Sequence, residues 1–420
     1  MDFEEIKNRA IASGKHLGVF LKWSILSIII GFVVGGFSSV FSLCMTFVTN
    51  YRLENPDIVY LMPLGGLFIV FLYKISDMEK DKGTNRVISA VNEKEEVPGR
   101  MAPLIFIATI TTHLFGGSAG REGAALQMGG SIGNTIGKLL KLSEQDKKIM
   151  VMCGMSASFS ALFGTPIAAA IFPVEVVSVG VMYFVALVPC VFASLIASNF
   201  AATMGISPEA FSIEAVAPFT AVNAGKIIAI AVLCALISML FCFLLHFTGG
   251  IFIAFFKNQY LRVLVASAII LGVTFLLGSR DYMGAGIPVI EKAMEGNVVF
   301  YAFIIKMLLT AVTLAGGFKG GEIVPSFFVG ATFGCLMGQL FGISPSLCAA
   351  VGMVAVFCGV TNCPISSILI GIELFGFEGV YYILIAVAIS FMLSGYTGLY
   401  RNQKIIYSKY EAKFININTQ

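Results

Sequence analysis

The chain has 420 residues, of which 57% are hydrophobic and only 12% are charged, and its formal net charge is +3 at pH 7. A soluble domain carries about 25% charged residues, so this chain could not cover a water-exposed surface and is expected to lie largely in lipid. The small net charge argues against nucleic acid as a partner. The nine cysteines form no Cys-x-x-Cys pair, which argues against a disulfide framework or a metal site, and no motif indicates a cofactor.

The N-terminal segment 1–16 is too charged for a signal peptide and predicts an amphipathic helix on the cytoplasmic side. A series of apolar segments follows between about residues 17 and 393. Several of them are too short to cross about 30 Å of hydrocarbon, which needs about 20 helical residues. Short apolar segments broken by glycine or proline predict helices that end within the membrane, where non-helical backbone must be buried or line a polar cavity.

Basic residues cluster in segments 7–22, 74–86, 138–148 and 401–413. The positive-inside rule places these segments on the cytoplasmic side, so both termini are predicted to be cytoplasmic. The link 50–57 holds one basic residue and is predicted to face outside. We therefore expect one integral membrane domain spanning the whole chain, 1–420.

The two halves of the chain repeat the same series of breaks. Positions 201 residues apart match as Gly83 and Gly284, Gly120 and Gly321, Ala124 and Pro325, Gly129 and Gly330, and Gly133 and Gly334. Positions 198 residues apart match as Pro166 and Pro364, Ile167 and Ile365, and Glu175 and Glu373. Chance similarity between glycine-rich helices would explain a single match, but it explains an ordered series of matches poorly. Repeats with broken segments at matching positions are typical of transporters whose site lies at the repeat interface. We expect a first repeat at 17–205, a second at 223–400 and a cytoplasmic tail at 401–420.

The segment from Gly116 to Gly123 contains an Arg121–Glu122 pair among four glycines. A helix that begins near Glu122 would point its unpaired N–H groups and positive dipole end into the membrane, where they bind an anion. Gly120, Arg121 and Gly123 would help to form this anion site. The Glu122 carboxylate would occupy the site itself and leave on protonation, which makes it a candidate gate and proton carrier. The alternative is a structural ion pair, but adjacent residues pair poorly, and an intramembrane carboxylate is functional by default.

The segment from Gly316 to Pro325 is the matching break in the second half. Pro325 suits the first turn of a helix, where its missing N–H is not needed. The N–H groups of Ile323 and Val324 would complete an anion cage with the first helix. Glu322 is a second candidate carboxylate, although an acid favoured by the helix dipole is an equally good interpretation.

Two hydroxyl groups are further candidates. Thr84 opens a predicted short helix after Gly83, and its hydroxyl would either donate to an anion or cap that helix. Tyr400 lies where the last apolar segment meets the basic tail, and its phenol would donate to an anion at the inner mouth. Tyr residues also belong to interfacial belts, and Tyr396 competes for the same role.

Glu175 and Glu373 each end an apolar helix that begins with proline. Either would serve as a proton relay, but an acid that reaches the membrane interface from a helix end is the preferred interpretation. The three histidines are scattered and show no metal spacing. No nucleophile–base set is evident, so we do not expect an enzyme.

The motif Gly120-Arg121-Glu122-Gly123 resembles the Gly-Lys/Arg-Glu-Gly-Pro motif of the CLC family of anion channels and transporters. The segment 320–325 resembles the family's Gly-Gly-x-x-x-Pro motif, and segment 83–87 stands at its Gly-Ser-Gly-x-Pro position. This resemblance extends over about 17–400. It implies an all-α inverted-repeat bundle of about eighteen tilted and broken helices, in a homodimer with one anion pathway in each subunit. It also implies that Glu122 is the external gate and that Thr84 and Tyr400 coordinate the central anion.

This sequence departs from the family pattern at several positions. Ala124 replaces the usual proline, and the Thr84 segment lacks the second glycine and the proline. Val176 stands where chloride/proton exchangers of the family often carry an acid. Glu322 resembles the bacterial fluoride/proton branch, although that branch tends to have Thr at position 324 and Met or Asn at position 84.

We therefore predict CLC-type transport of chloride or fluoride, coupled to protons through Glu122 and Glu322. A passive voltage-gated-type chloride channel on the same fold is the main alternative; the missing acid at Val176 favours it, whereas Glu322 argues against it. An organic-anion carrier is a further alternative. The expected partners are chloride or fluoride ions, protons, the lipid of a bacterial plasma membrane and a second copy of the chain.

Overall fold

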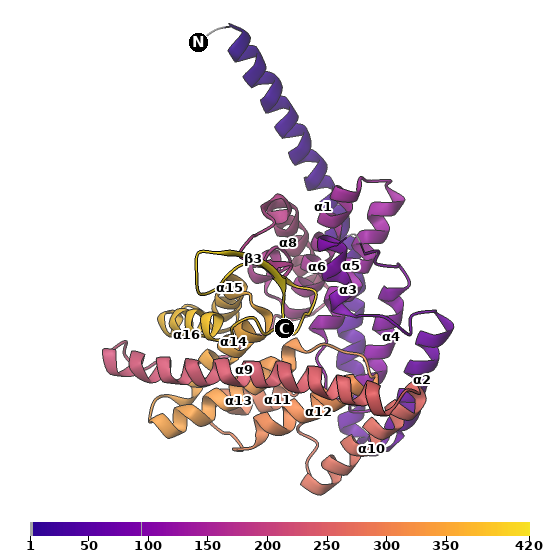
Figure 1. Ribbon diagram of the computed structural model, residues 1–420, viewed down its shortest axis with the longest axis vertical. Coiled ribbons are helices and arrows are strands. Elements are labelled where there is room, and N and C mark those ends of the chain that lie inside the picture. Colours follow the sequence, from indigo (N-terminus) through magenta and orange to yellow (C-terminus); the bar gives the residue numbers. More distant parts are fainter. Residues whose placement is uncertain (1–2, 94) are drawn as a thin grey trace.

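The computed structural model describes the backbone of residues 3–93 and 95–420, and the side chains from residue 14 onward within those ranges. The described residues form sixteen α-helices, two 3-10 helices and three short strands, which confirms the expected all-α bundle (Figure 1). The helices of the first half are α1 (Phe3–Glu54), η1 (Pro56–Leu61), α2 (Met62–Ile75), α3 (Thr84–Asn92), α4 (Met101–Leu114), α5 (Glu122–Leu139), α6 (Glu144–Phe163), α7 (Pro166–Val176), η2 (Phe184–Ala186) and α8 (Leu187–Thr203).

The second half begins after a linker without helix or strand. Its helices are α9 (Ala221–Phe255), α10 (Gln259–Leu277), α11 (Ile287–Met294), α12 (Ala302–Gly316), α13 (Ile323–Phe341), α14 (Pro345–Thr361), α15 (Pro364–Phe375) and α16 (Val380–Leu393). Figure 1 shows α9 running across the direction of α1, with the later helices α11 to α13 beside it.

The amphipathic segment predicted at 1–16 is not separate from the first apolar segment. From Phe3 the chain forms one continuous helix, α1, that ends at Glu54. The first two residues of the predicted segment lie outside the described residues. Residues 3–16 contain no proline and one glycine, Gly14, and a single glycine costs too little to end a helix.

Six helical segments in the described part of the chain are long and apolar enough to cross a membrane, and the longest of them are Gly14–Glu54 and Ala221–Phe255. Further apolar helices have only 10–17 residues, among them α4, α7 and α12. A helix of 17 residues is about 25 Å long, which is less than the hydrocarbon core of a bilayer. The described part of the chain therefore contains apolar helices too short to cross the bilayer, as the broken apolar segments predict.

Glycines bring neighbouring helices into backbone contact at the matching positions of the two halves. A Cβ on Gly129 in α5 would lie 2.0 Å from the carbonyl oxygen of Gly154 in α6. A Cβ on Gly330 in α13 would lie 2.3 Å from the carbonyl oxygen of Gly352 in α14. Small residues permit this close approach, which is a main source of helix association in lipid. These two contacts hold α5 and α13, the helices that follow the two glycine-rich breaks, against α6 and α14.

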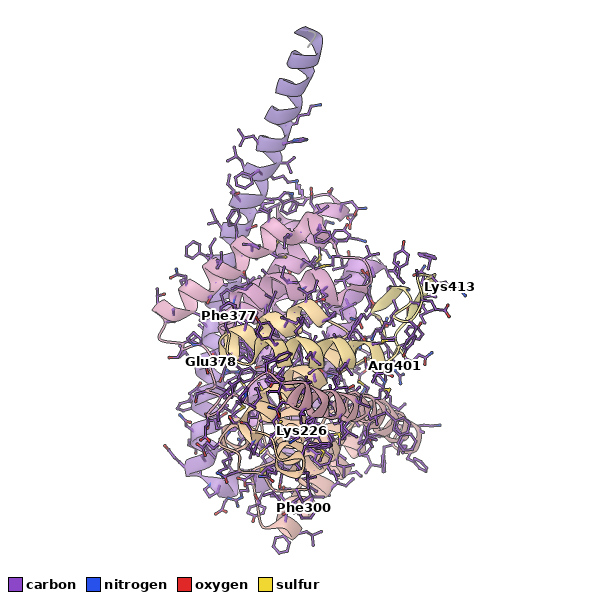
Figure 2. All side chains as sticks on the ribbon, turned by 90° about the vertical axis from the view of Figure 1, so that its left-hand side faces the viewer. Lys226, Phe300, Phe377, Glu378, Arg401 and Lys413 are labelled. Atoms are coloured by element: carbon purple, nitrogen blue, oxygen red, sulfur yellow. The ribbon has the colours of Figure 1, made fainter. Side chains whose placement is uncertain are left out.

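The segment predicted as a cytoplasmic tail, 401–420, contains two strands. Strand β2 (Lys404–Tyr407) pairs in parallel with β1 (Ser178–Val179) and antiparallel with β3 (Phe414–Asn418). Figure 2 shows Arg401 and Lys413 at one edge of the molecule, away from Phe377 and Glu378. The small sheet thus ties the end of the second half to the end of α7.

The interfacial position predicted for Glu175 is wrong. Glu175 is 5% exposed, and its carboxylate accepts hydrogen bonds from the amides of Ile365 and Ser366 at the start of α15. Glu373 is half-buried and accepts from the amides of Ile167 and Ala168 at the start of α7. Amides at a helix start have no partner within the helix, so an acid from another helix competes successfully for them.

Candidate functional site

The two glycine-rich breaks meet in the middle of the fold. The amide of Gly120 donates to the carbonyl of Gly321 at 2.7 Å, and the amide of Gly321 donates back to the carbonyl of Gly120 at 2.8 Å. This Gly120–Gly321 bridge joins the positions that the sequence repeat pairs. Because α5 begins at Glu122 and α13 begins at Ile323, the bridge brings together the positive ends of both helices.

Glu122 is 1% exposed, and its carboxylate folds back toward the start of its own helix. One carboxylate oxygen accepts a hydrogen bond from the amide of Arg121 at 3.1 Å. An anion attracted to the helix start would seek this same amide and dipole. The carboxyl group of Glu122 therefore lies beside a donor that could also bind a small anion.

Arg121 contacts two acids. Its guanidinium lies 2.7 Å from a carboxylate oxygen of Glu209 and 3.4 Å from one of Glu122. The expectation that the adjacent Arg121 and Glu122 do not pair is thus wrong in part, because a long contact forms. The short contact to Glu209 indicates that this distant acid is the main partner of Arg121.

Glu322 occupies the corresponding position before α13. It is the N-cap residue, but its side chain makes no capping hydrogen bond, so a capping role is not realised. One carboxylate oxygen is buried with no hydrogen-bond partner among the described residues. A Cβ on Gly123 would lie 3.2 Å from this oxygen, so the carboxylate faces the first turn of α5. An unpaired buried carboxylate oxygen is costly unless it takes a proton or a ligand.

Thr84 is the first residue of α3 and is 4% exposed. Gly83 is the N-cap of this helix and no side chain caps it, so ordinary capping by Thr84 is not observed. The Thr84 hydroxyl contacts the carbonyl of Gly123 at 3.5 Å and accepts from the side-chain amide of Gln127 at 3.2 Å. The start of α3 is thereby held against the first turns of α5.

Tyr400 is 1% exposed, and its hydroxyl has no hydrogen-bond partner in the described part of the chain. It lies within electrostatic reach of both Glu322 and Glu122. Tyr396, the competing tyrosine, is instead hydrogen-bonded to the hydroxyl of Ser408 at 2.8 Å. Of these two tyrosines, Tyr400 is therefore the one whose hydroxyl is available for a ligand.

The first residues of α13 supply further free donors. Ile323 and Val324 are 0% and 1% exposed, and their amides donate to no acceptor among residues 3–93 and 95–420. The amide of Gly123 likewise has no acceptor in the part of the chain that the structure describes. The bridge, the two helix starts and the hydroxyls of Thr84 and Tyr400 thus place several buried donors close together.

Two cavities approach this region. One of about 410 Å³ is lined by Arg121, Glu209 and His113, and one of about 200 Å³ is lined by Thr84 and Glu322. Glu122 and Tyr400 line neither of these two cavities, and both side chains are buried.

Sequence reasoning missed several residues near the site. Gln127, which holds Thr84, lies four residues after Gly123 on one face of α5, so helical spacing was an available signal. His113 contacts the carbonyl of Gly120 at 3.4 Å, and Glu209 pairs with Arg121. These two come from other elements, so no local pattern predicts them.

A comparison with family models matches residues 65–395 to the family described as voltage gated chloride channel. The "Chloride/fluoride channel protein" of Pseudomonas syringae pv. tomato is 33% identical over 396 residues, which cover 93% of this chain and 88% of that protein. The "H(+)/Cl(-) exchange transporter ClcA" of Vibrio cholerae is 24% identical, over 83% of this chain and 81% of that protein.

Solved structures give the same result. The crystal structure of a CLC-type fluoride/proton antiporter superposes with a TM-score of 0.88 at 29% identity, covering 91% of this chain and 98% of that chain. A slow cyanobacterial Cl⁻/H⁺ antiporter shares the fold, with a TM-score of 0.78 at 17% identity, over 89% of this chain and 94% of that chain. The shared fold and the matched family model together show that this chain belongs to the CLC family.

Proposed function

We propose that the protein exchanges small halide ions, fluoride or chloride, for protons across a membrane, with Glu122 as the gate. The observation that carries this proposal is the buried Glu122 carboxylate at the joined starts of α5 and α13, bonded to an amide that would otherwise serve an anion. The relatives support it, because one is named a chloride/fluoride channel protein and others are named proton antiporters of chloride or fluoride.

The chemistry follows from competition for the same donors. An ionised Glu122 is attracted by the positive ends of α5 and α13 and excludes other anions. A protonated Glu122 loses that attraction, so a halide can take its place at the free amides of Gly123, Ile323 and Val324. One proton is thereby required for each opening of the gate, which links the two fluxes.

The remaining site residues have supporting roles in this proposal. The hydroxyls of Thr84 and Tyr400 donate to the halide after it has lost its water. Arg121, held by Glu209, and the main chain of Gly120 fix the loop that carries the gate. Glu322 lines the cavity of about 200 Å³, and one of its oxygens has no hydrogen-bond partner among the described residues, so it is the second proton carrier.

The alternatives have less support. A passive channel needs neither the gate proton nor the unpaired carboxylate oxygen of Glu322. An organic-anion carrier has less support, because the relatives are named for chloride, fluoride and protons. We propose no enzymatic activity, since the relatives are named as channels and transporters.

We also propose a homodimer in a bacterial plasma membrane, with both termini cytoplasmic. Family membership supports the dimer, and the basic residues at the Arg401 and Lys413 edge support the orientation. Labelling a Lys413→Cys variant with an impermeant maleimide in intact cells tests the orientation. Strong labelling before cell lysis would show that the C-terminal segment faces the outside of the cell.

The test of the function uses purified protein in liposomes with the voltage clamped by an ionophore. Anion efflux and internal pH are followed together, first with fluoride and then with chloride. We expect the anion gradient to drive protons uphill, and Glu122→Gln to abolish this proton movement while anions still pass. Glu378→Gln, which changes an exposed acid, is the matched control. Fast anion flux without proton movement in the unmodified protein would establish the channel alternative.

A further inference from the structure

Arg121 lies between two acids, and its two contacts are unequal. Its guanidinium is 2.7 Å from a carboxylate oxygen of Glu209 but 3.4 Å from one of Glu122. The side chain of Glu122 is 1% exposed, whereas that of Glu209 is 23% exposed. The acid with the closer contact is therefore the more accessible one, and the buried gate carboxylate has the longer contact.

The linker that carries Glu209 is fixed at the end of α6. The amide of Glu209 donates to the carbonyl of Phe163, the last residue of α6, at 3.2 Å. The guanidinium of Arg121 reaches the same helix end, where it donates to the carbonyl of Leu162 at 3.4 Å. Both partners of the short contact are thus anchored on α6, so the main chain holds them in position.

Glu209 and Arg121 both line the cavity of about 410 Å³, which Glu122 does not line. Asn50, from the link predicted to face outside, lines the same cavity. Of the acids that line it, Glu209 is the one within 4.0 Å of Arg121 among the described residues. The pair therefore lies between this cavity and the gate.

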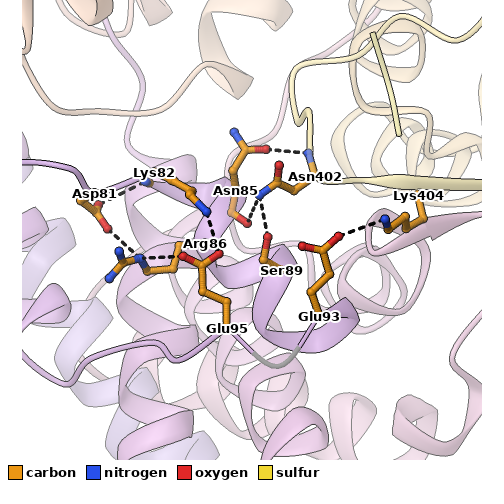
Figure 3. Close-up of polar contacts among 10 residues, drawn as sticks. Asp81, Lys82, Asn85, Arg86, Ser89, Glu93, Glu95, Asn402 and Lys404 are labelled. Atoms are coloured by element: carbon orange, nitrogen blue, oxygen red, sulfur yellow. Dashed lines mark hydrogen bonds and ion pairs between the residues drawn. The ribbon is translucent and has the colours of Figure 1, made fainter. Parts of the chain in front are cut away.

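Helix α3 contains a second arginine that two acids share (Figure 3). Arg86 lies 3.3 Å from a carboxylate oxygen of Asp81 and 3.7 Å from one of Glu95. The side chains of Asp81 and Glu95 are 1% and 25% exposed, close to the values for Glu122 and Glu209. At Arg86 the buried acid has the shorter contact, whereas at the gate the more accessible acid has it.

Other titratable and charged groups lie around Arg121 and Glu122. They are Arg52 of α1, His113 of α4, Arg280 and Asp281 of the loop before α11, Glu291 of α11, Lys306 of α12, and Glu322 and Tyr400 of the second half. None of these is an acid within 4.0 Å of Arg121 in the described ranges. A change at Glu209 therefore alters the charge beside Arg121 and leaves this set in place.

We propose that Glu209 is a positioning residue that keeps the Arg121 guanidinium from closing onto Glu122, and that it thereby sets the pH at which the gate opens. This inference rests on the proposed function, because it requires that Glu122 takes a proton when it leaves its site. An ionised Glu209 attracts the guanidinium and repels the gate carboxylate, and both effects favour protonation of the gate. Without Glu209, the guanidinium can approach Glu122, and a carboxylate paired with an arginine keeps its charge to lower pH.

The main test compares Glu209→Gln with Glu95→Gln in proteoliposomes. Both variants remove a partly exposed acid from an arginine that also contacts a buried acid. Halide-driven proton movement is recorded over a series of pH values that are equal on both sides of the membrane. We expect the pH of half-maximal transport to fall by about 1 unit in Glu209→Gln, as an approaching arginine stabilises an ionised carboxylate. Glu95→Gln should leave this pH unchanged.

A second test asks whether Glu209 acts through the gate. The Glu122→Gln variant has no gate carboxyl, and in the proposed function it still passes anions. In this background, Glu209→Gln should leave the pH dependence of anion flux unchanged. A merely structural role of Glu209 at the end of α6 would instead alter the flux in both backgrounds.

A third test restores the charge on a folded protein. Glu209 lines the cavity of about 410 Å³ and its side chain is 23% exposed, so a cysteine at this position can react with a thiol reagent. In Glu209→Cys, a reagent that adds a sulfonate should raise the pH of half-maximal transport toward that of the unmodified protein. A reagent that adds an ammonium group should lower it further. The unmodified protein, treated with both reagents, controls for its own cysteines.

An unchanged or higher pH of half-maximal transport in Glu209→Gln would overturn the proposal, as would a pH shift that persists without the gate carboxyl. If Glu209→Gln does not reach the membrane, the cysteine variant decides, and equal effects of the two reagents would then overturn the proposal. Failure of this inference is distinct from failure of the exchange function. The unmodified protein would still couple halide to protons in the first case and would not do so in the second.

Discussion

Glu175 and Glu373 each cap the start of the helix that carries the other. Glu175, near the end of α7, accepts at 2.9 Å and 2.8 Å from two amides at the start of α15, and at 2.6 Å from the Ser366 hydroxyl. Glu373, near the end of α15, accepts at 2.8 Å from each of two amides at the start of α7. Each carboxylate thus satisfies orphan donors and lies at the positive end of a helix dipole.

The first prediction concerns this reciprocal capping. Glu175→Ala leaves two amides and one hydroxyl without their acceptor, so it should lower the free energy of unfolding by about 1–3 kcal/mol. Glu175→Gln keeps an acceptor oxygen and should cost less. Thermal unfolding in detergent measures both, with the exposed Glu378→Ala as the control. A stable Glu175→Gln protein that transports anions without protons would instead identify Glu175 as a proton relay.

The second prediction concerns the Gly120–Gly321 bridge. A Cβ on Gly321 would lie 2.4 Å from the amide nitrogen of Gly123, so Gly321→Ala must push α5 and α13 apart. We expect a loss of halide transport and a lower yield of folded protein. Gly225→Ala, in α9, meets nothing within 4 Å and should leave transport unchanged. Normal transport by Gly321→Ala would show that the two helix starts need not touch.

The third prediction separates the two tyrosines. Tyr400 has a free buried hydroxyl, whereas the Tyr396 hydroxyl is bonded to Ser408. A hydrogen bond to a charged group contributes about 1.5–3 kcal/mol, so Tyr400→Phe should weaken halide binding roughly tenfold or more. Tyr396→Phe should bind halide normally. Isothermal titration with fluoride and chloride measures both variants, and the reverse ranking would assign the role to Tyr396.

The fourth prediction concerns Lys409 in the C-terminal segment. Its amine donates to Asn362 at 2.5 Å and to the carbonyl of Phe391 at 2.9 Å, and burial lowers the pKa of Lys409 to about 8. Between this value and the usual lysine pKa of 10.5, the unfolded chain binds more protons than the folded protein at this group. Stability from this group therefore rises with pH across that window.

A Lys409→Met variant lacks this dependence. We expect its melting temperature to fall further below that of the unmodified protein at pH 9.5 than at pH 7. Lys413→Met, which changes an exposed lysine of the same segment, is the control and should show no such trend. A gap that narrows as the pH rises would contradict the assignment of the lowered pKa to Lys409.

Much of the central site could be predicted from sequence because its signals are local. The glycines before Glu122 and Ile323 predict where α5 and α13 begin, and the repeat at a spacing of 201 residues pairs Gly120 with the residue that it contacts, Gly321. Helix starts depend on neighbouring residues, so a single sequence contains that information.

The missed features depend on which distant segments meet. Nothing near Glu175 indicates that its carboxylate reaches α15, about 190 residues later in the chain. Strand β2 pairs with only two residues after α7, too few to produce an alternating pattern. Glu209 lies in the linker between the two halves, and no local pattern indicates that it pairs with Arg121.

The Gly120–Gly321 bridge consists of main-chain atoms alone. Mutation can change side chains but leaves peptide groups in place, so evolution can alter the residues around the ion without dismantling the joint between the halves. Positions such as Thr84 and Val324 are therefore free to diversify, provided that the glycines persist. A lineage with this architecture can acquire a new ion preference in a few substitutions while inheriting the same scaffold.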